Sequence, residues 1–354
     1  MLNQLRKYLP PPSVNLLTNS LANRLYSRFL SNRQEVRFSC ELTTKCNIFC
    51  DFCTRTHFVE KENPQGEFLV KDMSDALVEK VLEEIERFHN AGMRVCFAPM
   101  GLGEQVLYKK FFETCERVKN ISKNIRIVLV TNGIQLTEND CEKILFCGLD
   151  EVSISLNTNE VSLYKDRMGL NKYEMVCNNI ERLLLLRNKS GKKKPSIFIQ
   201  YINFDGKKNN FSKDIKRWVR LMKHSDKCYV HPLVSQAGFF PDSNFNHKLK
   251  GHFPCTQLLW RIVIKVNGDL YPCDPAFYSG GVKINSLLLG NISNTSPYEI
   301  QFDLNSKPKR IARQMRKDDY SRLPECDSCN TYKLSPNIFF KIPLLRKLSG
   351  YKWF

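Results

Sequence analysis

The stretch VRFSCELTTKCNIFCDFC, residues 36–53, joins a short strand-like run to three closely spaced cysteines. The run at residues 36–42 has the length and composition of a buried β-strand. Cys46, Cys50 and Cys53 follow on a loop that leads into a helix-compatible segment. Three thiolates so close together can hold three corners of a 4Fe-4S cluster and leave the fourth iron without a protein ligand. A structural zinc site would normally close with a fourth ligand.

Length and composition limit the class of protein. A chain of 354 residues accommodates one α/β barrel of about 250 residues and a smaller module. The first residues run from two basic side chains into Pro10, Pro11 and Pro12 without an apolar core, so we expect no secretory signal. The 14 cysteines are then expected to be reduced, in a cytoplasmic protein. No run approaches the roughly 18 apolar residues of a membrane-spanning helix.

Strand-like and helix-like patterns alternate along the first two thirds of the chain, which predicts a parallel sheet with its functional loops at the carboxyl ends of the strands. The expected strands cover residues 36–42, 94–98, 125–131, 151–156, 197–202 and 228–233. The expected helices cover residues 74–90, 108–121, 137–146, 159–188 and 212–224. Residues 59–71, with Pro64 and Gly66 among charged side chains, are predicted to form a surface insertion.

The cysteine run resembles the signature of the radical S-adenosylmethionine (radical SAM) enzymes. This resemblance implies that the open iron chelates the amino and carboxylate groups of SAM, and that an electron from the cluster cleaves SAM to a 5'-deoxyadenosyl radical. It also implies an α/β fold built as an open, partial (βα)6 TIM-like barrel. Phe52 occupies the position where the family has an aromatic residue near the adenine, although ordinary loop packing would also explain it.

A glycine-rich element follows the second expected strand. Gly101-Leu102-Gly103-Glu104 resembles the family element in which backbone and carboxylate receive the ammonium group of SAM. Glycine allows close approach of the backbone, and the acid supplies the opposite charge. The family often continues with proline, whereas Gln105 follows here. An ordinary turn is the alternative interpretation.

Two further elements of the resemblance follow the third and fourth strands. Asn132, in Thr131-Asn132-Gly133, corresponds to an asparagine near the active site, although a plain turn explains Asn-Gly equally well. Ser153, Ser155 and Asn157 alternate, which places them on one face of a strand. Many relatives have aspartate where this chain has Asn157, so hydrogen bonding is kept there and the charge is lost.

An arginine completes the predicted SAM site. The segment Tyr164-Lys165-Asp166-Arg167-Met168-Gly169 resembles the family element whose arginine pairs with the SAM carboxylate, and this implies that role for Arg167. A planar guanidinium suits the bidentate contact. The alternative is a solvated arginine at the end of a helix.

A second cysteine group, Cys255, Cys273, Cys326 and Cys329, follows the expected barrel. Four thiolates can close a metal site, and their spacing fits zinc and an auxiliary 4Fe-4S cluster equally well. Residues 262–274 (IVIKVNGDLYPCD) predict a hairpin that turns at Asn-Gly. With residues 289–292 and the final C-x-x-C, they resemble the small α+β SPASM/Twitch extension of radical SAM enzymes. No cysteine follows Cys329, so the resemblance implies the Twitch form with one auxiliary cluster.

Four segments result: a basic amphipathic N-terminal segment (1–35), a radical SAM partial barrel (36–250), a Twitch-like cluster domain (251–332) and a basic, aromatic tail (333–354). The chain carries a net charge of +18, and residues 1–34 and 331–354 contain no acid. These ends either pack on the barrel as capping helices or contact an anionic membrane surface or a phosphorylated substrate. No nucleic-acid partner is expected, because no recognised binding module accompanies the charge.

The resemblance implies a radical SAM enzyme that abstracts hydrogen from its substrate, most simply to oxidise a sugar-like or other small molecule. The alternatives are epimerisation, in which Cys228 or Cys96 returns a hydrogen atom, and modification of a peptide. A non-catalytic metal-binding protein is the remote alternative. The expected partners are a small-molecule, glycan or peptide substrate and an external electron donor such as flavodoxin or ferredoxin.

Overall fold

A computed structural model describes residues 35–60, 70–204, 216–233, 255–275 and 286–316, together with Ser321, Leu323, Glu325, Cys326 and Cys329. The predicted basic ends at residues 1–34 and 333–354 lie outside the described residues. So do most of the predicted insertion at 59–71 and the first part of the predicted helix at 212–224.

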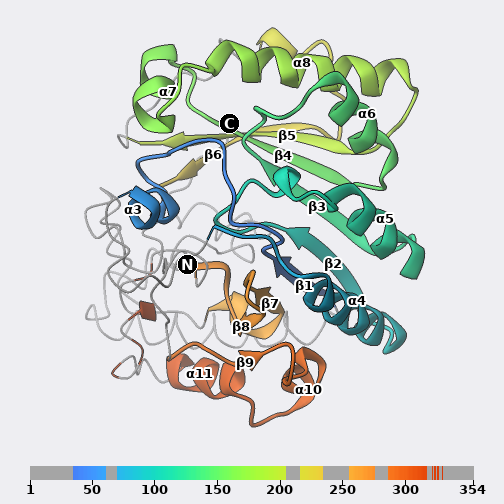
Figure 1. Ribbon diagram of the computed structural model, residues 1–354, viewed down its shortest axis with the longest axis vertical. Coiled ribbons are helices and arrows are strands. Elements are labelled where there is room, and N and C mark those ends of the chain that lie inside the picture. The colour runs from blue at the N-terminus through green and yellow to red at the C-terminus, as the bar shows by residue number, and fades with distance from the viewer. Residues whose placement is uncertain are drawn as a thin grey trace, which may run out of the picture.

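Six parallel strands form one curved sheet in chain order, with β6 at one edge and β1 continuing into the second module (Figure 1). They are β1 (Glu35–Cys40), β2 (Arg94–Pro99), β3 (Arg126–Thr131), β4 (Glu151–Asn157), β5 (Ser196–Asn203) and β6 (Lys227–Pro232). All six expected strands are therefore present within one or two residues of the predicted bounds.

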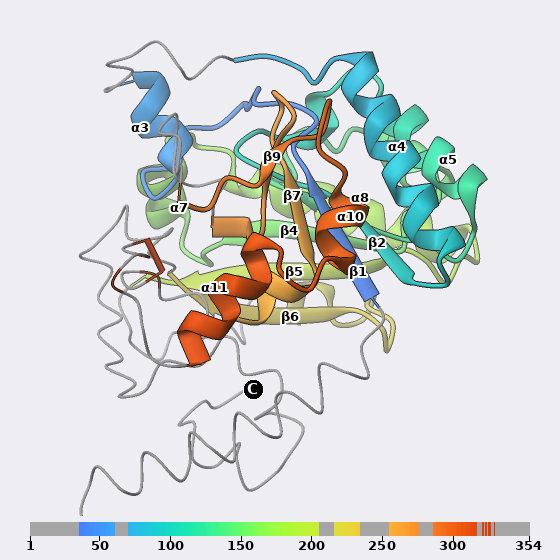
Figure 2. The same cartoon turned by 90° about the horizontal axis from the view of Figure 1, so that it is seen from below.

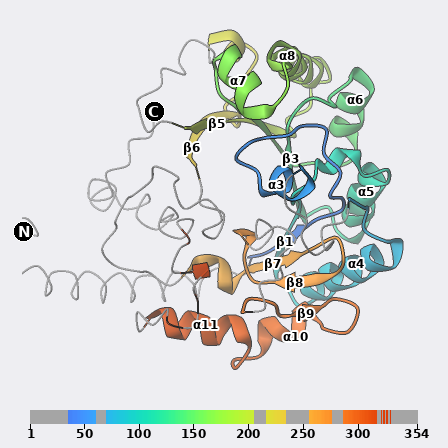
Figure 3. The same cartoon turned by 60° about the vertical axis from the view of Figure 1, so that its left-hand side comes forward.

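Helices follow the strands and cover the outer, convex side of the sheet (Figure 3). They are α4 (Asp75–Asn90), α5 (Phe111–Ile121), α6 (Glu138–Phe146), α7 (Val161–Met168) and α8 (Tyr173–Lys189). The 3₁₀ turn η1 (Gln105–Leu107) follows β2, and α3 (Thr54–Glu60) follows β1 and lies in the middle of the view in Figure 3, inside the ring of outer helices. Ser74 and Thr137 cap α4 and α6, each accepting a hydrogen bond from a backbone N–H of the first turn. This arrangement is the predicted partial (βα)6 barrel.

The single helix predicted at residues 159–188 is two helices, α7 and α8. Gly169 ends α7 in the left-handed conformation, with φ of 72°. A Cβ atom at this position would lie 3.0 Å from the carbonyl oxygen of Phe49, so the break seats the cysteine loop against the end of α7. The helical pattern alone does not show this contact, because it joins segments about 120 residues apart.

The two faces of the sheet differ in polarity. Alternate strand residues such as Phe38, Phe97 and Ile154 are fully buried in the core shared with the helices. The intervening residues face the inside of the barrel and include polar side chains such as Ser39 and Ser153. Strand alternation therefore separates a packing face from an interior face that can carry chemistry.

The second module extends the same sheet. It contributes η2 (Thr256–Leu259), β7 (Arg261–Ile264), β8 (Asp269–Tyr271), β9 (Gly290–Asn291), α10 (Pro297–Phe302) and α11 (Lys307–Arg316). β7 pairs in parallel with β1, and β8 pairs antiparallel with β7 through the predicted Asn267-Gly268 turn, where Gly268 has φ of 90°. Figure 2 shows α10 and α11 beside these strands. None of the described helices is long and apolar enough to cross a membrane.

Candidate active site

The first cysteine group lies on the loop between β1 and α3, at the carboxyl end of the strand. Two backbone hydrogen bonds hold this loop on the end of α7, from Phe49 N to Met168 O at 3.3 Å and from Asp51 N to Arg167 O at 3.0 Å. The Cys50 thiol, which is buried, lies 3.4 Å from the sulfur of Met168. Packing against a separate helix therefore fixes the loop.

The three thiols of this group share one buried environment. Burial, then the thiols of Cys53 and Cys46, raise the pKa of Cys50. Burial, then the carboxylate of Glu104, raises the pKa of Cys46 to about 11. Neutral thiols must lose protons to ligate a metal, so binding of a cationic iron centre would release protons here.

Glu104 lies beside the cysteines, at the end of β2. Its Oε2 accepts a hydrogen bond from the backbone N–H of Asn132 at 2.7 Å, and its Oε1 is buried without a hydrogen-bond partner. Burial raises the pKa of Glu104 to about 7, although the Asn132 N–H, the Thr131 side chain and the Val106 N–H lower it. An unpaired buried carboxylate oxygen is costly and is best satisfied by a cationic donor.

Glycine is required beside this carboxylate. A Cβ atom at Gly103 would lie 2.2 Å from the carbonyl oxygen of Thr43, so the G-x-G-E turn lies directly on the backbone before Cys46. The backbone N–H of Glu104 donates to Lys45 O at 2.7 Å. The sequence-predicted glutamate element and cysteine loop are thus one packed unit.

Three more of the predicted site residues lie in or against the cysteine loop: Phe52, Asn132 and Arg167. Asn132 donates to the side chain of Asn47 at 2.7 Å. The Phe52 ring lies 5.2 Å from the ring of Phe204, and the Arg167 guanidinium lies 4.7 Å from the same ring. Arg167 also forms an ion pair with Asp51, next to Cys50, and uses only part of its donor set.

The serines and asparagine of β4 have different surroundings. Ser153 bonds Tyr229 of β6 at 2.8 Å and accepts from Gln200 of β5, so it belongs to an interior polar network. Ser155 is partly exposed. Asn157 is buried, has φ of 67° and donates to Met168 Sδ at 3.4 Å. Asparagine tolerates this left-handed conformation better than most residues.

The second cysteine group lies in the module formed by β7 to α11. Cys273, Cys326 and Cys329 are buried in one cluster with Met315 of α11, and Cys255 packs against it. Burial, followed by the Cys329 thiol, raises the pKa of Cys255 to about 12. Four cysteines distant in sequence therefore meet in one apolar environment.

Two family models match this chain, in chain order. That of the radical SAM superfamily matches residues 40–193, and that of an iron-sulfur cluster-binding domain of the SPASM type matches residues 255–330. The chain belongs to the radical SAM superfamily. It carries a C-terminal SPASM-type domain, and the two matches contain the two cysteine groups, one in each.

Relatives match less than half of the length of this radical SAM protein. One is the tungsten-containing aldehyde ferredoxin oxidoreductase cofactor-modifying protein of Pyrococcus furiosus, 25% identical over 162 residues, covering 46% of this chain and 42% of the relative. Another is a probable GTP 3',8-cyclase of Archaeoglobus fulgidus, 29% identical over 141 residues, covering 40% of this chain and 42% of the relative. The chain therefore spans under half of the length of these relatives.

Solved structures share the fold at low identity. Native anSMEcpe with bound AdoMet has a TM-score of 0.57 at 17% identity, covering 89% of this chain and 100% of that chain. BtrN in complex with AdoMet and 2-DOIA has a TM-score of 0.53 at 15% identity, covering 84% and 93%. Streptococcus suis SuiB bound to precursor peptide SuiA has a TM-score of 0.55 at 13% identity, covering 95% and 79%.

The family implies a SAM-binding 4Fe-4S cluster, SAM and an auxiliary cluster, and the residues present fit these groups. No three Cys, His, Asp or Glu side chains of the described residues converge as ligands of a single ion would. Three spaced thiols suit a cluster, whose irons are themselves separated. The unpaired Glu104 Oε1 and the close turn at Gly103 suit an ammonium group held against the backbone.

Arg55 is a residue of this site that the sequence reasoning missed. It is 5% exposed, its Nε donates to Thr44 O at 2.8 Å, and its Nη1 is buried without a partner. Its backbone N–H and its charge both lower the pKa of Cys53, against the larger effect of burial. The only signal in the sequence was a cation two residues after the last cysteine.

The two cysteines predicted as hydrogen donors lie on opposite faces of the sheet. Cys228 is the register partner of Ile199, which is buried on the helix side, so Cys228 faces the helices and not the barrel interior. The structure does not bring it to the other site residues. Cys96 faces the interior, in a small cluster with Ala98 and Val128, and is fully buried.

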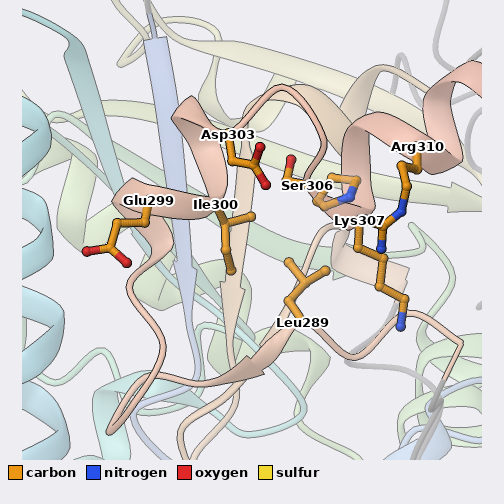
Figure 4. Close-up of a pocket in the computed structure, with 8 residues that line it drawn as sticks. Leu289, Glu299, Ile300, Asp303, Ser306, Lys307 and Arg310 are labelled. Atoms are coloured by element: carbon orange, nitrogen blue, oxygen red, sulfur yellow. The ribbon is translucent and has the colours of Figure 1, made fainter.

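A pocket in the second module is separate from both cysteine groups. It is lined by Leu289, Glu299, Ile300, Asp303, Ser306, Lys307, Pro308 and Arg310 (Figure 4). Figure 4 shows Glu299 pointing away from the other charged side chains. No cysteine and none of the SAM-site residues lines this pocket, so it is not the site of radical chemistry.

Proposed function

We propose that this protein cleaves SAM reductively and uses the product to abstract a hydrogen atom from a small organic substrate, oxidising it. The observation that carries the proposal is the buried, unpaired Oε1 of Glu104 beside the three thiols of the β1 loop. A buried carboxylate oxygen without a partner is costly, and a cationic donor that enters the site would remove that cost. The proposed SAM site supplies that cation as the ammonium group of the methionine moiety.

The residue roles follow from this placement. We assign Cys46, Cys50 and Cys53 to the SAM-binding cluster and Cys255, Cys273, Cys326 and Cys329 to the auxiliary cluster. When bound, these groups supply the electron that cleaves SAM to a 5'-deoxyadenosyl radical and an acceptor for the second electron of an oxidation.

The chain's own side chains orient SAM and exclude water. Glu104 and Gly103 would hold the ammonium group, and Arg167 would hold the carboxylate with the donors that Asp51 leaves free. Phe52, within the cysteine loop, and Asn132, which donates to Asn47 of the same loop, would limit the position of the nucleoside. Ser155 and Asn157 would border SAM from β4.

Oxidation is favoured over epimerisation by two observations. A second group of four buried cysteines gives an electron acceptor a place in the same chain. Cys228 faces the helices, and Cys96 is fully buried, so neither thiol is exposed on the interior face to return a hydrogen atom. The hydroxyls of Ser153 and Tyr229 give this face groups that suit a hydroxyl-bearing substrate.

Peptide modification is the second candidate. SuiB, which shares the fold, was solved with a precursor peptide.

For this chain we propose a cytoplasmic enzyme with the domain extents given above. Its electrons would come from an external electron donor such as flavodoxin or ferredoxin.

The test is formation of 5'-deoxyadenosine by anaerobically reconstituted protein with dithionite and SAM, measured by mass spectrometry. Wild type should form it, and Cys50→Ala should form none. Cys141→Ala is the matched control, because it removes a buried thiol from α6, outside both groups, and it should retain activity. Wild-type protein with a full iron content that forms no 5'-deoxyadenosine would exclude the proposed function.

A further inference from the structure

Three arginines lie in one register row on the interior face of the barrel. Arg37 of β1 is the partner of Arg261 on β7 and of Cys96 on β2, and Cys96 is the partner of Arg126 on β3. All three guanidinium groups lower the pKa of the buried Cys96 thiol, against the larger effect of burial, so they converge on it. Charged side chains rarely share a row inside a barrel unless they have partners.

Of the three arginines, Arg126 alone forms ion pairs with two carboxylates. It pairs with Glu35 at 3.2 Å and with Glu151 at 3.5 Å. Arg261 contacts Asp274 through Nη1, which lies 3.1 Å from a carboxylate oxygen, and its Nε is buried without a hydrogen-bond partner. Arg37 has no carboxylate within ion-pair distance among the described residues.

Arg37 is the least satisfied of the three. Its Nη2 contacts the sulfur of Met100 at 3.4 Å, and its Nε is buried without a partner. Neighbouring guanidinium groups repel each other, and burial and the Arg37 guanidinium lower the pKa of Arg261 while the Asp274 carboxylate raises it. An added oxyanion would accept hydrogen bonds from the unpaired Nε–H groups of Arg37 and Arg261.

Arg37 and Arg261 contact residues that are adjacent in sequence to parts of both predicted cluster sites. Met100, which contacts Arg37, directly precedes the Gly101–Glu104 element of the SAM site. Asp274, which contacts Arg261, directly follows Cys273, and it accepts from Ser39 of β1 at 2.6 Å. A ligand held by this pair of arginines would therefore lie between the SAM site and the auxiliary group.

We propose that Arg37 and Arg261 bind an oxyanion of the substrate, a phosphate or a carboxylate group. This inference rests on the proposed function and deepens it, because it makes the substrate an anionic molecule. Two planar guanidinium forks on adjacent strands suit the bidentate contacts of such a group.

The experiment is isothermal titration of anaerobically reconstituted, full-length protein with inorganic phosphate and, separately, with acetate, at constant ionic strength set with chloride. Arg37→Gln and Arg261→Gln should each weaken binding by at least about tenfold. Arg37→Lys, which keeps the charge and loses the fork, should bind with intermediate affinity. Arg117→Gln is the matched control, because Arg117 pairs with Glu79 on the outer helices, and it should bind as wild type does.

The outcomes separate this inference from the proposed function. Binding of phosphate alone, acetate alone or both supports the site and assigns its ligand chemistry, provided that Arg37→Gln and Arg261→Gln lose it. No saturable binding to wild type, or binding to both variants that is as tight as binding to wild type, overturns the inference. Formation of 5'-deoxyadenosine, followed in the same wild-type preparation, reports on the proposed function independently. An iron content near that of wild type shows that a variant has assembled.

Discussion

The backbone N–H of Asn132 donates to Glu104 Oε2 at 2.7 Å and leaves Glu104 Oε1 buried and unpaired. The loop after β3 thus orients the carboxylate at the end of β2 and keeps one oxygen for an incoming donor. The account of the SAM site depends on this relationship, because it keeps one carboxylate oxygen of Glu104 available to the amino group of SAM.

Glu104→Gln should weaken SAM binding while both clusters still assemble. The amide keeps the shape and the acceptor for Asn132 but loses the charge, and loss of one charge-assisted contact costs about 1.5 to 3 kcal/mol. Equilibrium binding of SAM to reconstituted protein measures the effect. Glu113→Gln, on the first turn of α5, is the control. Equal SAM affinity in wild type and Glu104→Gln would show that the carboxylate does not receive the ammonium.

The pH dependence of SAM binding should report the same group. Burial raises the pKa of Glu104 to about 7, so the ammonium-binding carboxylate form is lost as the pH falls through that value. At pH 6 only about a tenth of Glu104 would be ionised in the SAM-free protein. SAM affinity should therefore rise between pH 6 and pH 7.5 in wild type and stay flat in Glu104→Gln. A parallel rise in both proteins would assign the titration to another group.

Arg55→Gln should lower the reduction potential of the SAM-binding cluster. The buried guanidinium of Arg55 stabilises the extra negative charge that the reduced cluster carries near Cys53. If the variant loses about 1.5 kcal/mol of this stabilisation, the one-electron reduction potential falls by about 60 mV. A redox titration followed by electron paramagnetic resonance measures the shift. The auxiliary cluster is the internal control and should keep its potential. Equal shifts of both clusters would indicate a general change in the fold.

Asp226→Ala should destabilise the barrel by about 3 to 5 kcal/mol, because it leaves the Arg187 charge buried and unpaired. The two side chains are fully buried and bond at 2.6 and 2.7 Å. Anaerobic denaturant unfolding measures the loss. Asp166→Ala, on the exposed side of α7, should change stability by less than about 0.5 kcal/mol. Similar losses in both variants would contradict the importance of the buried pair.

The ion pair between Asp226 and Arg187 should make the free energy of unfolding depend on pH. Burial alone would raise the pKa of Asp226, but hydrogen bonds from Arg187 and from two backbone N–H groups hold it below its ordinary value. A depressed folded-state pKa gives stability that is present above the unfolded pKa, near 4, and is lost as the pH falls through the folded value. Wild type should therefore lose more stability than Asp226→Ala on acidification below about pH 4.

The strands of the barrel were predictable from sequence because each is a short run rich in apolar and β-branched side chains with a packing face, as in residues 125–131. The cysteine loop and Glu104 were predictable because their chemistry depends on residue type and short spacing. The break between α7 and α8 at Gly169 could not be predicted from sequence, because its cause is contact with Phe49. The pairing of Arg37 with Arg261 could not be predicted either, because β7 joins the sheet beside β1 from more than 200 residues away in the chain.

The direct test of the central claim is electron paramagnetic resonance of dithionite-reduced Cys326→Ala/Cys329→Ala protein, with and without SAM. This variant should retain the cluster of the β1 loop, with about four irons per chain, and SAM should change its spectrum because SAM binds the open iron. Cys46→Ala/Cys50→Ala/Cys53→Ala protein should keep the auxiliary signal, and SAM should leave it unchanged. A spectrum of the first variant that is identical with and without SAM would contradict the assignment of Cys46, Cys50 and Cys53 to a SAM-binding cluster.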